Sequence, residues 1–215
     1  MSYEQKYIYV MFSSTPFKMG KFIRKITNYE FNHVSVCLHT KEMTMYSFAR
    51  IFKGHPFYGG FVKESSARFI HNETCAHVKL CAIPVSDAKY NRLKKYVEQM
   101  EDDSDKYVYN HLSAIGAVFK KKVKVKDAYT CVEFTTKLLN KSEALPQMDK
   151  NKFYGIRELE ETLAQYVVYQ GPFENMRLEV NNQGDTFYKN KNYYTGMYLA
   201  FCTNARLFYS FFRSY

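Results

Sequence analysis

The stretch "FNHVSVCLHTKEMTMYSFAR", residues 31–50, holds two β-rich runs separated by the polar triplet "TKE". In the first run, "FNHVSVCLH", apolar and polar side chains alternate, as they do in a strand with one apolar face. The second run, "MTMYSFAR", also has the composition of a strand. Together they predict a β-hairpin with strands at residues 31–39 and 43–50.

Further predicted strands surround this hairpin. They are the runs "KYIYVMFSS" (6–14), "GGFVKE" (59–64) and "AHVKLCAIPV" (76–85). Helical spacing of apolar residues occurs in "STPFKMGKFIRKIT" (14–27) and "SDAKYNRLKKYVEQMED" (86–102). The first 140 residues therefore predict an α+β fold in which an antiparallel sheet is combined with few helices.

The predicted helix after residue 14 has a recognisable start. Ser14 or Thr15 is expected to cap it, and Pro16 lies in its first turn, where a missing N–H is tolerated. The usual rule for an amphipathic helix predicts that its apolar side faces the core. The residues expected to face inward are Phe17, Phe22, Ile23 and Ile26, and those expected to face largely outward are Lys18, Lys21, Arg24 and Lys25.

The C-terminal part is less regular. A helix is predicted at about residues 157–165, followed by a short extended piece that stops at Gly171 and Pro172. The final stretch, "MYLAFCTNARLFYSFFRSY" (197–215), is dense in Tyr and Phe and fits a strand, a helix that covers the sheet, or an exposed end. We expect one domain over residues 1–172 and an aromatic extension over residues 173–215 that packs on it.

The charge of the chain favours an anionic partner. Its 215 residues include 31 Lys+Arg and 21 Asp+Glu, which gives a net charge of +10. A lysine-rich run attracts anionic surfaces without specificity, although a solvated edge strand that resists aggregation has the same composition. Nucleic acid is not the expected partner, because no reading motif is present. The densest run contains Lys120, Lys121, Lys122, Lys124 and Lys126.

Composition also limits the cellular and chemical setting. No window approaches the roughly 20 apolar residues of a membrane span, and the start lacks the pattern of a signal peptide, so a cytoplasmic protein is expected. The cysteines at positions 37, 75, 81, 131 and 202 lack CxxC spacing, which argues against a disulfide framework and a four-cysteine zinc site. Two other sets, Cys75/His77/Cys81 and His33/Cys37/His39, also lack familiar zinc spacing. No metal or other cofactor is expected.

One cysteine stands at the start of a predicted helix. In "YTCVEFTTKLLN" (129–140), Thr130 is available as a cap and Cys131 would open the helix. The positive end of a helix and a nearby imidazole stabilise a thiolate, but a buried structural cysteine has the same pattern. His33, on the more polar side of its predicted strand, is a candidate base, and a core histidine without chemistry is the alternative.

The order of these motifs resembles a known family. A histidine in "NHVS", a hairpin with "YSFAR" and "GGFVKE", and much later "YTCVEF" at a helix start are similar to the circularly permuted NlpC-like branch of the papain-fold cysteine hydrolases. That branch includes YiiX-like proteins and relatives of lecithin-retinol acyltransferase. The likeness runs from about residue 7 to residue 172, and it implies a permuted papain-like fold with the sheet packed against the cysteine helix.

The resemblance implies roles for individual residues. Cys131 would be the nucleophile, His33 its general base and later the acid, and the backbone N–H of Cys131 part of an oxyanion hole. Many relatives have a glutamate near the position of "MYSFAR", which contains no carboxylate here. Ser47, Tyr46 and Glu64 remain alternatives for orienting the imidazole, because sequence does not fix hairpin register.

Three more residues belong to the candidate site. Glu133, two positions after the cysteine, is interpreted as a capping carboxylate. Asn110, in "KYVYNHLSAIG", is interpreted mainly as a structural cap or cleft wall. The candidate substrate-binding residues are Tyr46, Tyr129 and Asn110.

Two functions remain open. The first is a metal-independent cysteine hydrolase, a peptidase or amidase or an acyl-ester or thioester hydrolase, that works through an acyl-enzyme on Cys131. Because no export signal is found, an intracellular peptide, isopeptide or lipid-derived acyl group fits better than a cell-wall peptide. The second is a catalytically inactive ligand-binding module on the same fold, which the missing carboxylate in "MYSFAR" favours.

Overall fold

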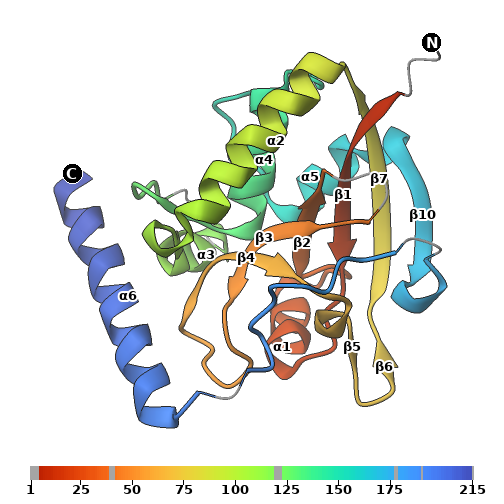
Figure 1. Ribbon diagram of the computed structural model, residues 1–215. Coiled ribbons are helices and arrows are strands. Elements are labelled where there is room, and N and C mark those ends of the chain that lie inside the picture. Colours follow the sequence, from red (N-terminus) through yellow and green to blue (C-terminus); the bar gives the residue numbers. More distant parts are fainter. Residues whose placement is uncertain (1–4, 39–41, 119–122, 177–178, 190, 215) are drawn as a thin grey trace.

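The protein is an α+β structure built on one large, mostly antiparallel sheet (Figure 1). The computed structural model describes residues 5–38, 42–118, 123–176, 179–189 and 191–214. Within them the strand order is β10-β7-β1-β2-β3-β4-β8-β9, and the β8–β9 pair is the parallel one. This confirms the predicted α+β class with an antiparallel sheet, and the described residues contain six α-helices.

The strands lie close to their predicted positions. The hairpin is formed by β2 (His33–Cys37) and β3 (Met45–Arg50), which pair antiparallel with Val36 opposite Tyr46. Residues 39–41, between them, lie outside the described residues. The other strands of the sheet are β1 (Lys6–Ser13), β4 (Gly59–Glu64), β7 (His77–Val85), β8 (Val108–Tyr109), β9 (Ala128–Tyr129) and β10 (Val167–Pro172). A separate hairpin comprises β5 (Ile70–His71) and β6 (Thr74–Cys75).

Apolar clusters cover both faces of the sheet. Alternate residues of β2 separate between them: Val34 and Val36 pack in one cluster, and Cys37 packs in the other. The first cluster extends to Phe134, and the second contains Phe69. Because both faces are buried, the side chains of β2 have little access to water, and all five of its residues are buried.

The first cluster is covered by helices. The long helices α2 (Asp87–Asp102) and α4 (Cys131–Ser142) lie over this part of the sheet (Figure 1). On α2 the expected stripe is buried at Tyr90, Leu93, Val97 and Met100. Two shorter helices are α3 (His111–Val118) and α5 (Ile156–Thr162). Single 3₁₀ turns are η1 (Ser66–Arg68), η2 (Ser104–Lys106), η3 (Ala164–Tyr166) and η4 (Phe173–Asn175).

Helix α1 (Lys18–Thr27) is oriented differently from the prediction. It begins after Phe17, and neither Ser14 nor Thr15 caps it, because the N-cap position is Phe17. Phe17 is buried as expected, but Phe22, Ile23 and Ile26 are 59%, 37% and 53% exposed, so their predicted inward orientation was wrong. The inward side instead carries Gly20 and Arg24, because a polar set of contacts fixes the helix to the loop before it.

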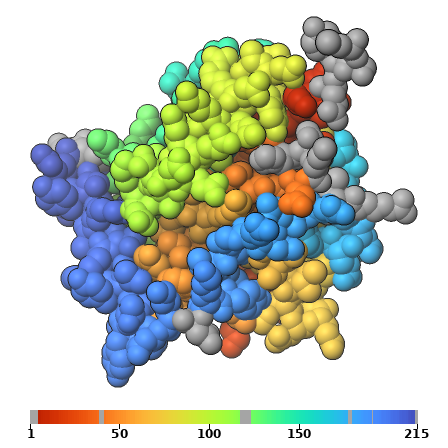
Figure 2. Space-filling view, in the orientation of Figure 1, coloured from red at the N-terminus to blue at the C-terminus, as the bar shows by residue number. Residues whose placement is uncertain are grey.

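The C-terminal extension ends in a long helix, α6 (Tyr193–Ser214), and not in a strand. This helix stands along one side of the molecule in Figures 1 and 2. Leu207 is buried against the body, whereas Tyr194, Phe201 and Phe212 are each more than two-thirds exposed, at 80%, 73% and 73%. Among the described residues, no helix combines the length and the apolar character that a membrane span requires.

Candidate active site

Cys131 is the first residue of α4, as predicted. Thr130 caps this helix: its Oγ1 accepts the N–H of Glu133 at 3.2 Å, and Glu133 Oε2 accepts the N–H of Thr130 at 2.8 Å. Ser113 Oγ donates to the other Glu133 oxygen at 2.7 Å. This capping box confirms the interpretation of Glu133 and holds Cys131 at the positive end of the helix.

His33 is the first residue of β2, and a carboxylate from another strand holds its imidazole. His33 Nε2 lies 2.7 Å from Oε1 of Glu64, the last residue of β4. Ser47 Oγ donates to the same carboxylate oxygen at 2.9 Å and lies 3.3 Å from His33 Nε2. Ser35 Oγ donates to Oε2 of Glu64. All four side chains are buried.

The register of β3 and β4 brings the carboxylate to this position. Glu64 of β4 pairs with Met45 of β3, and Ser47 of β3 pairs with Val62 of β4. Ser47 is two residues from Met45, so its side chain lies on the same face of the sheet as that of Glu64. Of the three alternatives for orienting the imidazole, Glu64 and Ser47 therefore contact it. Tyr46 points elsewhere, because its hydroxyl donates to Glu101 Oε2 at 3.2 Å.

The charge of Glu64 controls the protonation of His33. Burial by itself lowers the pKa of His33, but the Glu64 charge and hydrogen bonds to Cys131 and Glu64 outweigh it and raise the pKa to about 10. Burial raises the pKa of Glu64, but the charge of His33 and its hydrogen bond dominate, so the pKa is lowered. These directions describe an imidazolium–carboxylate pair, with the Cys131 thiol beside it.

The pair and the thiol are largely enclosed. Cys131 is 6% exposed and His33 is 9% exposed. Tyr109, on β8, lies near enough for the charges of Cys131 and Glu133 to add to the effect of burial, and all three raise the pKa of its phenol. Tyr109 therefore stays protonated at neutral pH.

The three candidate substrate-binding residues have contacts of their own. Tyr129, on β9, is half-buried, and its hydroxyl accepts a hydrogen bond from Lys137. Asn110 is buried: its Oδ1 accepts the N–H of Ser113 at 2.9 Å, and its amide donates to the Val123 carbonyl at 2.8 Å. These bonds give Asn110 the capping role expected for it.

Sequence reasoning did not select Ser35 or Tyr109 for the site. Ser35 follows His33 by two positions, and strand alternation already put it on the same face. Tyr109 directly precedes Asn110 in the motif "YVYNHL". Both signals were present in the sequence, but many serines and tyrosines in this chain share them.

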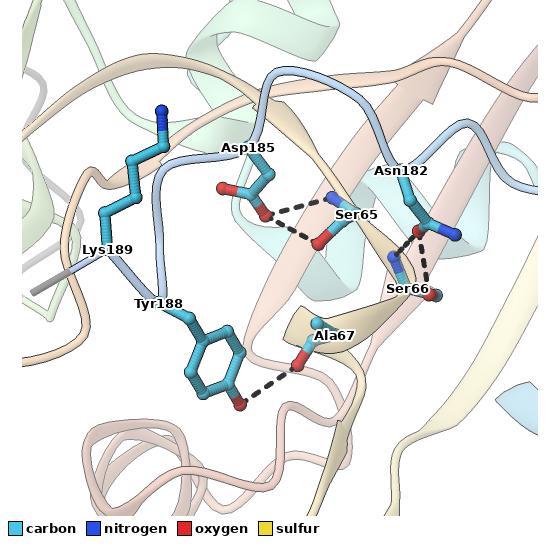
Figure 3. Close-up of a pocket in the computed structure, with 7 residues that line it drawn as sticks. All are labelled: Ser65, Ser66, Ala67, Asn182, Asp185, Tyr188 and Lys189. Carbon is cyan, nitrogen blue, oxygen red and sulfur yellow. Dashed lines mark hydrogen bonds between the residues drawn. The ribbon is translucent and has the colours of Figure 1, made fainter.

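Two hollows described on the surface are lined by residues other than Cys131 and His33. One, of about 420 Å³, lies between η1 and the extended segment before α6 (Figure 3). Its polar groups are satisfied within the protein: Asp185 accepts from Ser65 N and Oγ at 3.0 and 2.8 Å, and Asn182 accepts twice from Ser66. The second, of about 550 Å³, lies between β4, the end of α2 and α6.

The candidate metal ligands are dispersed. His77 Nδ1 lies 2.5 Å from Glu30 Oε1, while Cys81 is buried in the core, where burial raises its pKa to about 12. Among the described residues, no group of three or more His, Cys, Asp and Glu side chains is placed to hold a metal ion. His39 lies outside the described residues.

The lysine run is only partly described. Lys124 and Lys126 are exposed, on a loop in which Val125 bridges to Ala128. Lys120, Lys121 and Lys122 lie outside the described residues.

Comparisons with protein-family models, with curated proteins and with solved structures found no significant match to this chain. The proposed function therefore rests on the arrangement of Cys131, His33 and Glu64.

Proposed function

We propose that the protein is a cysteine hydrolase of the permuted papain-like type, acting on an amide, ester or thioester. The observation that carries the proposal is the grouping of a carboxylate, an imidazole and a thiol: Glu64 Oε1 lies 2.7 Å from His33 Nε2, and a hydrogen bond with Cys131, at the start of α4, helps to raise the pKa of His33. A nucleophile, a base and a group that orients the base are the parts that acyl transfer requires. Their order, with the histidine strand before the cysteine helix, fits the permuted branch.

The proposed reaction uses these groups in turn. In the reactive form His33 holds the proton as imidazolium and Cys131 is the thiolate, whose sulfur attacks the carbonyl carbon to form a C–S bond. Collapse of the tetrahedral intermediate breaks the bond to the leaving group, which takes the proton from His33. Water, deprotonated by His33, then attacks the acyl-enzyme and releases the acid and the thiol. The N–H of Cys131 has no helical acceptor, because it lies in the first turn, and it supports the oxyanion.

Glu64 supplies what "MYSFAR" lacks. The carboxylate comes from β4 and holds the imidazole through a 2.7 Å contact, with Ser47 and Ser35 satisfying its remaining acceptor sites. The absence of a carboxylate from the β3 segment favoured an inactive ligand-binding module. Because Glu64 provides a carboxylate at the imidazole, this reason no longer applies. Glu64 therefore stabilises the protonated form of His33, which the proposed reaction uses as the acid.

One observation favours the alternative, a catalytically inactive ligand-binding module. Cys131 is only 6% exposed and packs within the main apolar cluster, as a structural cysteine does. A hydrolase requires that a substrate carbonyl reach this sulfur, whereas a binding module does not. The reactivity of Cys131 therefore separates the two functions.

The test is alkylation of the intact protein with iodoacetamide at pH 6, with the labelled cysteine identified by mass spectrometry. Cys202 is an exposed thiol in the same chain and serves as an internal reference. At pH 6 an ordinary thiol, with a pKa of about 8.5, is almost entirely protonated. We expect Cys131 to react faster than Cys202 despite its burial, and His33→Ala to remove this advantage.

The matched control is Cys131→Ala, which should lose the fast label and keep the fold, as judged by circular dichroism. Selective labelling of Cys131 would justify a screen of amide, ester and thioester substrates. If Cys202 reacts first in the wild type, or if His33→Ala leaves the Cys131 rate unchanged, the hydrolase proposal fails and the binding module is preferred.

A further inference from the structure

Helix α1 presents an apolar stripe to solvent. Met19, Phe22, Ile23 and Ile26 follow the spacing i, i+3, i+4, i+7 and are 37%, 59%, 37% and 53% exposed. Figure 1 shows α1 in the lower part of the view, away from α2 and α4. A helix that buries its apolar side in its own core would show the opposite exposure.

The side of α1 that docks on the protein is polar. Arg24 Nη1 donates to the Thr15 carbonyl at 2.9 Å and to Asn32 Oδ1 at 2.6 Å. Gly20 lies so close to the loop that an added Cβ would be 2.2 Å from Thr15 Oγ1. Rolling the helix to bury its apolar stripe would break these hydrogen bonds and this close approach, so the outward orientation is fixed by the fold.

Basic residues border the stripe. Lys18, Lys21 and Lys25 follow one another at i, i+3 and i+7 and are all exposed. The helix contains no acidic residue, and the whole chain has a net charge of +10. A short helix with an apolar face beside a lysine row is typical of a segment that lies in the interface of a bilayer, with its apolar side chains among the acyl chains.

We propose that α1 docks the protein on the surface of an anionic bilayer, with the helix lying in the membrane plane. Each lysine near an anionic leaflet strengthens binding roughly fivefold, and the four apolar side chains add the hydrophobic contribution. A second copy of the chain is a poorer occupant, because it carries the same net charge of +10 and the two copies repel each other. The proposal does not depend on the cysteine chemistry.

The other exposed apolar helix, α6, provides a matched control. Phe201 and Phe212 are both 73% exposed, so changing them removes at least as much exposed apolar surface as changing Phe22 and Ile26 in α1 does. No lysine lies in α6, whose basic residues are Arg206 and Arg213, and Arg206 bonds the Asp105 carbonyl at 2.9 Å. Binding that required α6 and not α1 would contradict the proposal.

The first experiment is co-sedimentation of the full chain with vesicles of phosphatidylcholine, with or without phosphatidylglycerol. We expect binding only when phosphatidylglycerol is present, with weakening at high salt. Phe22→Ser combined with Ile26→Ser should weaken binding at least about tenfold, and Phe201→Ser combined with Phe212→Ser should not. Lys18→Gln, Lys21→Gln and Lys25→Gln together should remove the preference for the anionic lipid.

The second experiment reports where α1 lies, and uses the absence of tryptophan from the chain. In Phe22→Trp, the single indole should shift its emission to the blue on anionic vesicles and be quenched by brominated acyl chains. In Phe201→Trp, neither change is expected. An unchanged Phe22→Trp spectrum, equal binding by the α1 and wild-type proteins, or a solution dimer that Phe22→Ser dissociates would each overturn the proposal.

Discussion

At the residue scale, the central feature is a carboxylate that reaches the imidazole from a distant part of the chain. Glu64 and His33 are 31 positions apart and meet because β3 connects their strands in the sheet. Their contact is buried on both sides, with side-chain exposures of 11% for His33 and 1% for Glu64. In such an environment neither charge is stabilised by water, so each depends on the other.

Glu64→Gln tests this dependence. Glutamine preserves the shape of the side chain but removes its charge, so the imidazolium loses its main support and burial again favours neutral imidazole. We expect alkylation of Cys131 at pH 6 to slow by roughly tenfold or more, as measured by mass spectrometry. Ser47→Ala removes a 2.9 Å hydrogen bond to the carboxylate and keeps its charge, so its effect should be several times smaller. Equal effects would mean that hydrogen bonding, and not charge, holds the site.

How much of this site could be predicted depends on the type of contact. Local patterns, a helix start and an alternating strand, made Cys131 and His33 candidates, and the resemblance to the permuted papain-like branch favoured them over the structural interpretations. Glu64 could only remain one of three alternatives, because a shift of one residue in the β3–β4 register would turn its side chain to the other face of the sheet. Tyr46, an equally plausible choice on sequence, proved to bond Glu101.

At the element scale, the start of α4 depends on its capping box. Thr130 and Glu133 each satisfy a backbone N–H that the first turn leaves unpaired. Thr130→Ala should lower the free energy of unfolding by about 1 kcal/mol, measured by urea denaturation. It should also slow labelling of Cys131, because the fraying of this turn displaces the thiol. Thr136→Ala, in the same helix, removes a 3.0 Å bond to the Glu133 carbonyl and should have a much smaller effect on both.

The element with the largest departure from prediction is α1. Periodicity correctly predicted an amphipathic helix there, and also the strands β1, β2, β4 and β7, because spacing is a property of the local sequence. It could not decide which side of α1 would contact the protein. That choice was made by Gly20 and Arg24, whose contacts with Thr15 and Asn32 are specific to the folded loop.

At the scale of the whole molecule, the C-terminal extension is attached by a buried ion pair. Arg68 donates to Asp185 through Nε at 2.8 Å and Nη2 at 2.7 Å, and both side chains are 5% exposed. Asp185 also accepts two hydrogen bonds from Ser65, the N-cap residue of η1 (Figure 3). The carboxylate of Asp185 therefore connects the extension to both Arg68 and Ser65. The extension is therefore fixed to the sheet domain by contacts of the segment that precedes α6.

Asp185→Asn should detach this segment, because it leaves the guanidinium of Arg68 buried without a counter-charge. A loss of about 3–5 kcal/mol in unfolding free energy is expected. Trypsin should also cleave faster at the lysines and arginines of the extension, residues 173–215. The control is Asp103→Asn, which breaks an exposed ion pair with Lys106. The side chain of Asp103 is 48% exposed and that of Lys106 is 65% exposed. That variant should lose less than about 1 kcal/mol. Similar losses in the two variants would show that the Arg68–Asp185 pair does not anchor the extension.

The same buried charges predict how stability depends on pH. The pKa of His33 is raised from 6.5 to about 10, so its contribution is complete below pH 6.5 and is lost as pH rises toward 10. The pKa values of Glu64 and Asp185 are lowered from 4.5 and 3.8, so their contributions are complete above those values and are lost on acidification. These groups together favour maximal stability between about pH 4.5 and pH 6.5.

Urea unfolding at pH 5.5 and pH 8 checks the alkaline side of this maximum. The wild type should lose unfolding free energy between the two values, because folding retains a proton on His33 that the unfolded chain releases. In Glu64→Gln, burial lowers the pKa of His33 without the opposing carboxylate, so the loss should shrink or change sign. An equal loss in both proteins would assign the pH dependence to groups other than His33, and the imidazolium would then not be the form that Glu64 stabilises beside Cys131.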